Sequence, residues 1–284
     1  MPQEHNNTYI IDAESAAEMA RLNLQGQIYT QVQRGPLAER NNNFTGLRHI
    51  LDIACGPGEW ALDVAERAPM STVTGIDISE RMIAYARAQA QAKSLQNAQF
   101  QIMDILHLVK FPSASFDLMN ARLLTGVLPS AYWPGLVQHY SRLLRPGGMI
   151  RLTEAGSGDS SSVSLNWFMG KLTQALRSSG YGFSTDGRSY GMYQLGSLLR
   201  NGGFSEVTWG ASILDYSYGT PAHVSSLENA RIALKLTQPF LARAGVADEQ
   251  EIDHRYQSML VEMESPTFSG IQELMTVYGT KPEE

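Results

Sequence analysis

The sequence predicts an α/β protein, in which helices cover both faces of an open, mostly parallel sheet of seven strands. Between residues 49 and 155, short apolar runs of strand length alternate with segments whose apolar residues recur at helical spacing. Units of this length favour parallel strands joined by right-handed crossover helices. The chain of 284 residues, 43% of them apolar, is long enough for one large domain or for one domain with a substantial insertion.

Composition excludes several classes of protein. The 22 basic and 28 acidic residues give a net charge of −6 without any block of Lys or Arg, so nucleic acid is not an expected partner. No apolar run approaches the length of a membrane span, and the first 30 residues lack the pattern of a signal peptide. We therefore expect a cytoplasmic protein without membrane insertion. The single cysteine, Cys55, excludes an internal disulfide and a multi-cysteine metal site.

A helix is expected before the sheet begins. Ser15 and Glu18 form the pattern of a capping box, which predicts a helix from there to about Val32. Residues 33–46 are rich in turn formers, and His49–Ala54 is the first strand. A glycine turn and a second helix follow that strand.

The alternation of strand and helix then continues regularly. Ser79 is placed to cap the helix after the second strand, and apolar spacing predicts another helix that ends at Arg145-Pro146-Gly147-Gly148. The remaining strands of this region are predicted at Thr72–Asp77, Ala98–Met103, Phe116–Ala121 and Gly148–Glu154.

After residue 155 the alternation breaks. Strands are predicted at Phe204–Ile213 and Gly270–Gly279, and between them two helices, the first ending near Pro239. We therefore expect three cap segments outside the sheet, two of them helical additions and one a helix with a Gly/Tyr-rich loop. The expected division is a cap segment at 1–44, the core at 45–155, a cap at 156–192, core again at 193–213, a cap at 221–264 and the final core strand at 268–280.

The turn after the first strand is the sharpest feature, and it reads Asp52-Ile-Ala-Cys-Gly56-Pro57-Gly58. Glycines at such a turn let a ligand approach the backbone, and Asp77 at the end of the second strand is placed to bond ribose hydroxyls. Both a dinucleotide and S-adenosyl-L-methionine (SAM) fit this pattern. The turn and Asp77 therefore predict an adenosine-type cofactor without choosing between the two.

Three further features favour SAM. Asp52 precedes the turn, where a carboxylate attracts a cationic amino group and repels a pyrophosphate. Asp104 ends the third strand, where it can accept a hydrogen bond from the adenine amine. The sheet also finishes without a second complete nucleotide-binding half. Together these features predict SAM as the cofactor.

The runs LDIACGPG, GIDIS, MD, FDLMNAR and LLRPGG follow one another between residues 51 and 148. In this order they resemble the class I SAM-dependent methyltransferases, and within them the small-molecule branch of ubiquinone and menaquinone biosynthesis. The resemblance covers about residues 45–155 and implies a Rossmann-like sheet whose last strand runs antiparallel, with a helical cap. Ala54 departs from the pattern, because the family usually has glycine there.

The resemblance implies cofactor-binding roles for residues at these strand ends. Asp52 would lie near the amino group of SAM, Ala54 to Gly58 would wrap its methionine part, and Asp77 would hold the ribose hydroxyls. Arg122 has three interpretations of equal weight: it binds the cofactor carboxylate, binds an acidic substrate group, or pairs with a helix acid such as Glu59. The other residues implied are Ile78, Met82, Asp104 and Ile105 around adenine, and Ala121 beside the sulfonium.

The sequence assigns no catalytic residue. His107 and His223 lie outside the expected core elements and are the candidate bases, while Tyr29 either folds over the cofactor or packs. The histidines have no metal-ligand spacing, so no metal is expected. Most of the aromatic and methionine side chains of the inserted segments are expected to form the core of the cap, and some to line an apolar pocket: Trp167, Phe168, Met169, Tyr181, Phe183, Tyr190, Met192, Tyr193, Tyr216 and Tyr218.

These observations predict methyl transfer from SAM to an O, N or C atom of a small, largely apolar or aromatic molecule. Two alternatives stay open. One is a SAM-binding protein that does not methylate, such as a rearrangement enzyme, and the other is an NAD-dependent oxidoreductase. The sequence does not name the substrate, the accepting atom or the oligomeric state.

Overall fold

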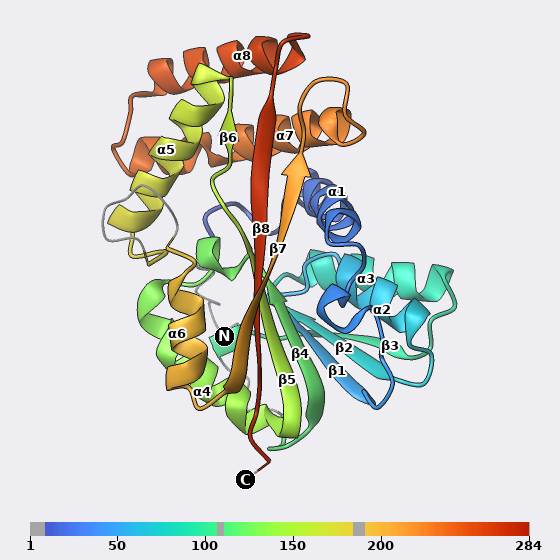
Figure 1. The fold of residues 1–284 in the computed structure, drawn as a ribbon. Helices are drawn as coiled ribbons and strands as arrows, with labels where there is room; N and C mark the ends of the chain where they lie inside the picture. Colours follow the sequence, from blue (N-terminus) through green and yellow to red (C-terminus); the bar gives the residue numbers. More distant parts are fainter. Residues whose placement is uncertain (1–8, 107–110, 184–190, 284) are drawn as a thin grey trace, which may run out of the picture.

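Five parallel strands form the centre of the sheet in the computed structural model, which describes residues 9–106, 111–183 and 191–283 (Figure 1). They lie side by side in the order β3-β2-β1-β4-β5. The direction of winding therefore reverses between β1 and β4, and ligands of such sheets bind outside the carboxyl ends of the strands at that point. In chain order the strands are β1 (His49–Ile53), β2 (Thr72–Asp77), β3 (Ala98–Ile102), β4 (Phe116–Arg122) and β5 (Leu144–Ala155).

The last long strand, β8 (Gly270–Thr280), runs antiparallel between β5 and β7 (Ser205–Asp215). The predicted mostly parallel sheet with an antiparallel last strand is confirmed. Within the described residues the sheet has eight strands rather than the seven expected, because Asp159–Ser160 form a short strand, β6, against the start of β8. Gly158, with a φ of +71°, lets the chain turn back to this edge after β5.

Each face of the parallel strands packs on its own group of helices. Ile50 of β1 is buried with side chains of α2 (Glu59–Arg67) and α3 (Glu80–Ala92), whereas Leu51 is buried with α4 (Trp133–Leu143) and α6 (Gln194–Asn201). Side chains of successive strand residues point to opposite faces, so a strand covered on both sides is apolar throughout. This packing explains why the core strands appear in the sequence as continuous apolar runs.

Serine caps begin two of the helices as predicted. The Ser15 hydroxyl accepts from the backbone N–H of Glu18 at 3.4 Å, and Ser79 accepts from that of Met82 at 3.1 Å. The first helix, α1 (Ala16–Val32), has only half of the expected capping box. The Glu18 carboxylate turns away from the cap and binds Arg21 at 2.6 Å, because both side chains are buried and the charges need each other there.

The predicted end of one helix, near Pro239, was wrong. α7 (His223–Arg243) continues through Pro239 instead of ending near it, and α8 (Glu249–Glu264) follows. A proline inside a helix removes a hydrogen bond and costs about 3 kcal/mol. Phe240 and Leu241 bury their side chains directly after it, and the burial of two large apolar side chains offsets that cost.

A layer of helices lies beyond the carboxyl ends of β1–β5. In Figure 1, α5 (Val163–Ser178), α7 and α8 gather around the far ends of β7 and β8, and α1 lies beside β7. Their apolar side chains share a core with residues of the two long strands, among them Leu214 and Leu274. Within the described part of the chain, none of the helices is long and apolar enough to cross a membrane.

Candidate active site

A cavity of about 370 Å³ lies between the strand ends of the sheet and the helices α1, α5 and α7. Gly58 and Ala121, which sequence analysis placed at the cofactor, do not line it, and neither does the candidate base His223. His107 lies outside the described residues. The predicted residues that do line it are Tyr29, Asp52, Ala54, Gly56, Asp77, Ile78, Met82, Asp104, Ile105 and Arg122.

The glycine turn has a left-handed backbone at three of its residues. The φ angles of Ala54, Gly56 and Gly58 are +50°, +54° and +85°. A Cβ on Gly58 would come within 2.8 Å of the Ala86 side chain and 2.9 Å of Phe100, so this glycine permits close packing of the turn on α3 and β3. Ala54 stands where the family usually has glycine, and its left-handed backbone is a conformation that alanine adopts only with strain.

Carboxylates end the neighbouring strands β1 and β2, and another follows β3. Asp77 accepts hydrogen bonds from the backbone N–H groups of Gly56 at 2.8 Å and Ser79 at 3.0 Å, and burial raises its pKa. Asp104 accepts from the backbone N–H of Leu106 at 2.9 Å. Asp77 therefore holds the glycine turn in place as well as facing the cavity.

Asp52 belongs to a buried chain of polar side chains. Asn120 of β4 donates to Asp52 at 2.6 Å and accepts from Arg151 of β5 at 2.6 Å, and Arg151 donates to Glu39 at 2.5 Å. Burial raises the pKa of Asp52 to about 7, while the positive charge of Arg122 opposes the rise. The carboxyl group is thereby fixed at the cavity wall, where a cationic ligand group would favour its ionised form.

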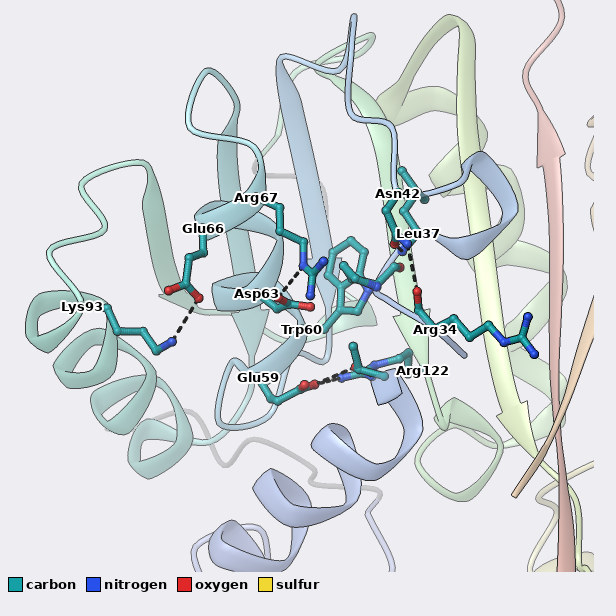
Figure 2. Close-up of polar contacts among 12 residues, drawn as sticks. Arg34, Leu37, Asn42, Glu59, Trp60, Asp63, Glu66, Arg67, Lys93 and Arg122 are labelled. Atoms are coloured by element: carbon teal, nitrogen blue, oxygen red, sulfur yellow. Dashed lines mark hydrogen bonds and ion pairs between the residues drawn. The ribbon is translucent and has the colours of Figure 1, made fainter. Parts of the chain in front are cut away.

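Arg122 pairs with a helix acid, which was one of its three interpretations. Its guanidinium donates to Glu59 of α2 at 2.8 Å (Figure 2). It also donates to the Thr30 hydroxyl of α1 at 3.1 Å. Gly26 of α1 makes room for this contact, because a Cβ there would lie 2.7 Å from the Glu59 carboxylate. Thr30, Glu59 and Arg122 join α1 to the start of α2 and the end of β4, and we call these three residues the α1 clamp.

Comparison with known proteins identifies the core. A family model described as "Methyltransferase domain" matches residues 50–148. Nocamycin O-methyltransferase of Saccharothrix syringae is 37% identical over 105 residues, which are 37% of this chain and 36% of that protein. Demethylmenaquinone methyltransferase of Deinococcus radiodurans is 38% identical over 108 residues, 38% of this chain and 43% of that protein. The chain carries a class I SAM-dependent methyltransferase domain.

The matches to these two relatives cover less than half of the length of either one. A match to trans-aconitate 2-methyltransferase of Deinococcus radiodurans is longer, with 27% identity over 216 residues, which are 74% of this chain and 78% of that protein. The likeness of the fold extends further. The solved structure of the [4+2]-cyclase SpnF is similar over 96% of this chain and 97% of its own, with a TM-score of 0.51 and 19% identity. At that identity the likeness concerns the fold alone.

The side chains around the cavity fit SAM, the cofactor of the methyltransferase domain. SAM carries hydrogen-bond donors at its ammonium group, its ribose hydroxyls and its adenine amine, and carboxylates accept from all three. Asp52, Asp77 and Asp104 supply three such acceptors along one edge of the sheet. Met82 and Ile105 line the cavity close by and are apolar, as an adenine ring requires.

Tyr29 and the candidate base His223, both singled out from the sequence, have structural partners. Burial raises the pKa of Tyr29 to about 12, and its hydroxyl donates to Gln272 at 3.1 Å. Tyr29 thus keeps its proton at neutral pH and acts as a donor. His223 is buried, and its Nε2 lies 2.9 Å from the backbone carbonyl oxygen of Met263. It therefore lies in the core of the helical layer and not at the cavity.

Sequence reasoning missed Glu154, which lines the cavity at the end of β5. The Thr125 backbone N–H and hydroxyl donate to its carboxylate at 3.1 and 2.6 Å, and burial raises its pKa to about 7. The rule that selected Asp77 and Asp104 would have found it, because Glu154 also ends a core strand.

Sequence reasoning also missed Arg21 and Asn229, which line the cavity from α1 and α7. Neither belongs to a motif. The aromatic residues of the inserted segments were expected mainly in the core of the cap, and of that set only Met169 and Tyr216 line the cavity among the described residues. Tyr190 lies outside the described residues.

Proposed function

We propose that the protein transfers the methyl group of SAM to a small, largely apolar molecule. One observation carries this proposal: a single cavity has carboxylates of the sheet edge at one end and aliphatic side chains of α5 and α7 at the other. The first end suits a polar, cationic cofactor, and the second suits an apolar acceptor. Because both ends belong to one cavity, the two ligands can meet.

For the cofactor we propose the roles that the sequence implied. Asp52 receives the ammonium group, the glycine turn faces the methionine part and Asp77 accepts from the ribose hydroxyls. Ile78, Met82, Asp104 and Ile105 surround adenine. The clamp between Arg122 and Glu59 supports a structural role for Arg122, since its charge is already paired. Gly58 and Ala121 shape the turn and the β4 end without lining the cavity.

SAM supplies a methyl group made electrophilic by the sulfonium. The residues of this chain bind and orient the two ligands and exclude water from the space between them, which accounts for much of the rate of such a reaction. Where the attacking atom carries a proton, Glu154 is the carboxylate at the cavity wall that can accept it.

The proposal is tested by titrating the protein with SAM, with its demethylated product and with NAD, and then screening apolar phenols, amines and quinones with labelled SAM. We expect binding of SAM and its product, no binding of NAD, and a product heavier by one CH₂. Binding of NAD instead of SAM would indicate an oxidoreductase. A bound SAM with a product of unchanged mass would indicate a rearrangement enzyme.

A further inference from the structure

Much of the cavity wall away from the sheet is aliphatic, although Ser226, Asn229 and Thr237 of α7 also line the cavity. We call the aliphatic part the apolar chamber and define it by Leu165, Met169, Leu172 and Leu176 of α5, Leu234 of α7 and Met263 of α8. A chamber of this kind binds a hydrocarbon part of a ligand but gives it no fixed orientation, because the hydrophobic effect is non-directional. Orientation has to come from the few polar groups at its wall.

One of these polar groups is Arg21, which belongs to a buried ion pair. Its Nε and Nη2 donate to the two carboxylate oxygens of Glu18 at 2.7 and 2.6 Å. The side chains of Arg21 and Glu18 are 5% and 0% exposed, so the pair is held rigidly and its net charge is zero. An additional charge placed beside this pair would be buried without a counter-charge, which is costly.

Arg21 fixes the orientation of Asn229. Its Nη1 donates to the Asn229 Oδ1 at 3.1 Å, across 208 residues of sequence. A guanidinium has only donors, so the amide must present its oxygen to Arg21 and turn its NH₂ group away. Among the residues that the structure describes, the Nδ2 atom of Asn229, which carries this NH₂ group, donates no hydrogen bond.

The two other amides that line the cavity, Gln25 and Gln272, differ in this respect, because each already donates a hydrogen bond through its NH₂ group, Gln25 to the Tyr29 hydroxyl at 3.4 Å. Gln272 accepts from the Tyr29 hydroxyl at 3.1 Å and donates to the Gly156 carbonyl at 2.8 Å, so both of its ends are used. Within the described residues both hydrogens of the Asn229 NH₂ group are thus unused, whereas one of the two of Gln272 is already taken. A donor of this kind binds an oxygen acceptor on the ligand.

We propose that Asn229, oriented by Arg21, binds an uncharged oxygen acceptor, such as a ketone or ester carbonyl, on an otherwise aliphatic substrate. This inference rests on the proposed function and narrows its substrate class. A carboxylate beside the Arg21–Glu18 pair would add a buried negative charge, and an amine would add a positive one and bring a donor against a donor. The site is therefore expected to prefer the neutral carbonyl compound to both the carboxylate and the amine.

The test uses three probes of equal chain length, 2-nonanone, nonanoate and nonylamine, titrated by calorimetry into the protein saturated with S-adenosylhomocysteine. We expect the ketone to bind at least tenfold more tightly than either charged probe. Asn229→Asp keeps an oxygen for Arg21 but loses the NH₂ donor, and Asn229→Leu loses both. Each should weaken ketone binding about tenfold while leaving the affinity for S-adenosylhomocysteine unchanged.

Leu172→Ala is the matched control, because it removes apolar contact from the wall of the chamber without touching a polar group. It should weaken the binding of all three probes by a similar factor. The proposal is overturned if the ketone binds equally to the native protein and to Asn229→Asp, if a charged probe binds as tightly as the ketone, or if no probe binds. Failure of the proposed function would appear separately, because the native protein would then not bind S-adenosylhomocysteine. Titrations of the three probes in the absence of S-adenosylhomocysteine would still decide the role of Asn229.

Discussion

At the scale of single residues, the carboxylates at the strand ends serve both the backbone and the cavity. Asp77 is the clearest example. It accepts from two backbone N–H groups and lines the cavity. Asp52 likewise belongs to a buried chain that reaches Glu39 and lines the same cavity. Changes at these residues should therefore affect stability and binding together.

Asp77→Ala is expected to weaken SAM binding by about 2–4 kcal/mol, because two charge-assisted hydrogen bonds to the ribose are lost. It should also lower the free energy of unfolding by about 1–3 kcal/mol, since the Gly56 and Ser79 N–H groups lose their acceptor. Calorimetric titration and urea unfolding measure the two effects. The control is Glu80→Ala, an exposed acid of the next helix. Tight SAM binding by Asp77→Ala would remove Asp77 from the ribose site.

SAM affinity should rise between pH 6 and pH 7.5 because of Asp52. Burial raises its pKa to about 7, so the carboxyl group is mostly protonated at pH 6, and binding of the cationic cofactor requires its ionised form. Affinity should therefore increase roughly tenfold over this interval, with a proton released on binding at pH 6. Asp52→Asn should bind weakly and without this pH dependence. A native affinity that stays constant across the interval would contradict the assignment.

The raised pKa of Asp52 has the opposite effect on the stability of the protein without ligand: its contribution to the free energy of unfolding falls as pH rises, whereas SAM affinity increases. In the unfolded chain the carboxyl group ionises near its ordinary value, so the unfolded state loses its proton before the native state does. The native protein is therefore favoured most at low pH by this group, and that contribution is lost as pH rises from about 4 to about 7. Bound SAM removes the penalty, because the ammonium group stabilises the ionised form.

At the scale of elements, α1 is the helix that joins the sheet edge to the helical layer. It packs on α7 and contacts α2. Arg21 of this helix donates to Asn229, and Thr30 of the same helix belongs to the α1 clamp. A displacement of α1 would therefore alter both ends of the cavity. The spacing between α1 and α2 depends on Gly26, which has no side chain.

Gly26→Ala should destabilise the protein although alanine is the better helix former. The new Cβ would lie 2.7 Å from the Glu59 carboxylate, which Arg122 and Thr30 hold in place. We expect a loss of about 1–3 kcal/mol from overpacking, larger than the gain of up to about 1 kcal/mol in helix propensity. The control is Gly170→Ala in α5, which meets nothing within 4 Å and should stabilise. Urea unfolding measures the stability of both variants. Stabilisation by both substitutions would contradict the prediction, because it would show that Glu59 can move away from the new Cβ at little cost.

At the scale of the whole molecule, the cavity lies between two layers with separate cores. The sheet edge contributes the carboxylates, and α5, α7 and α8 contribute the apolar chamber. Residues 10, 11 and 13 of the N-terminal segment also line the cavity. We propose that the segments 1–44, 156–192 and 221–264 act as a cap that closes over bound ligands.

Closure predicts slower hydrogen exchange in α5 and in residues 9–13 when S-adenosylhomocysteine and 2-nonanone are both bound. We expect at least tenfold slower exchange there, because each opening would have to expose the ligands. The helix α4, which lies against the lower part of the sheet in Figure 1, is the internal control and should be unchanged. Equal exchange in α5 with and without ligands would mean that the layer is passive.

The sequence alone determined the parallel core and the carboxylates that line the cavity at the sheet edge. Strand runs, the glycine turn and the acids at strand ends are local features, and parallel strands bring their carboxyl ends to one edge without further information. Asp52, Asp77 and Asp104 could therefore be named in advance, and Glu154 could have been found in the same way. The cap was foreseen as three segments, but not its contacts.

Only the tertiary structure decided what depends on contacts between distant segments. The choice among three partners for Arg122 required the position of α2 relative to α1, and the pairing of Arg21 with Asn229 joins residues 208 apart in sequence. Pro239 stays inside a helix because Phe240 and Leu241 find a core that local spacing does not reveal. Packing across the cavity is a property of the assembled layers, and so the aliphatic lining and the fixed amide donor at its wall emerge only when the layers meet.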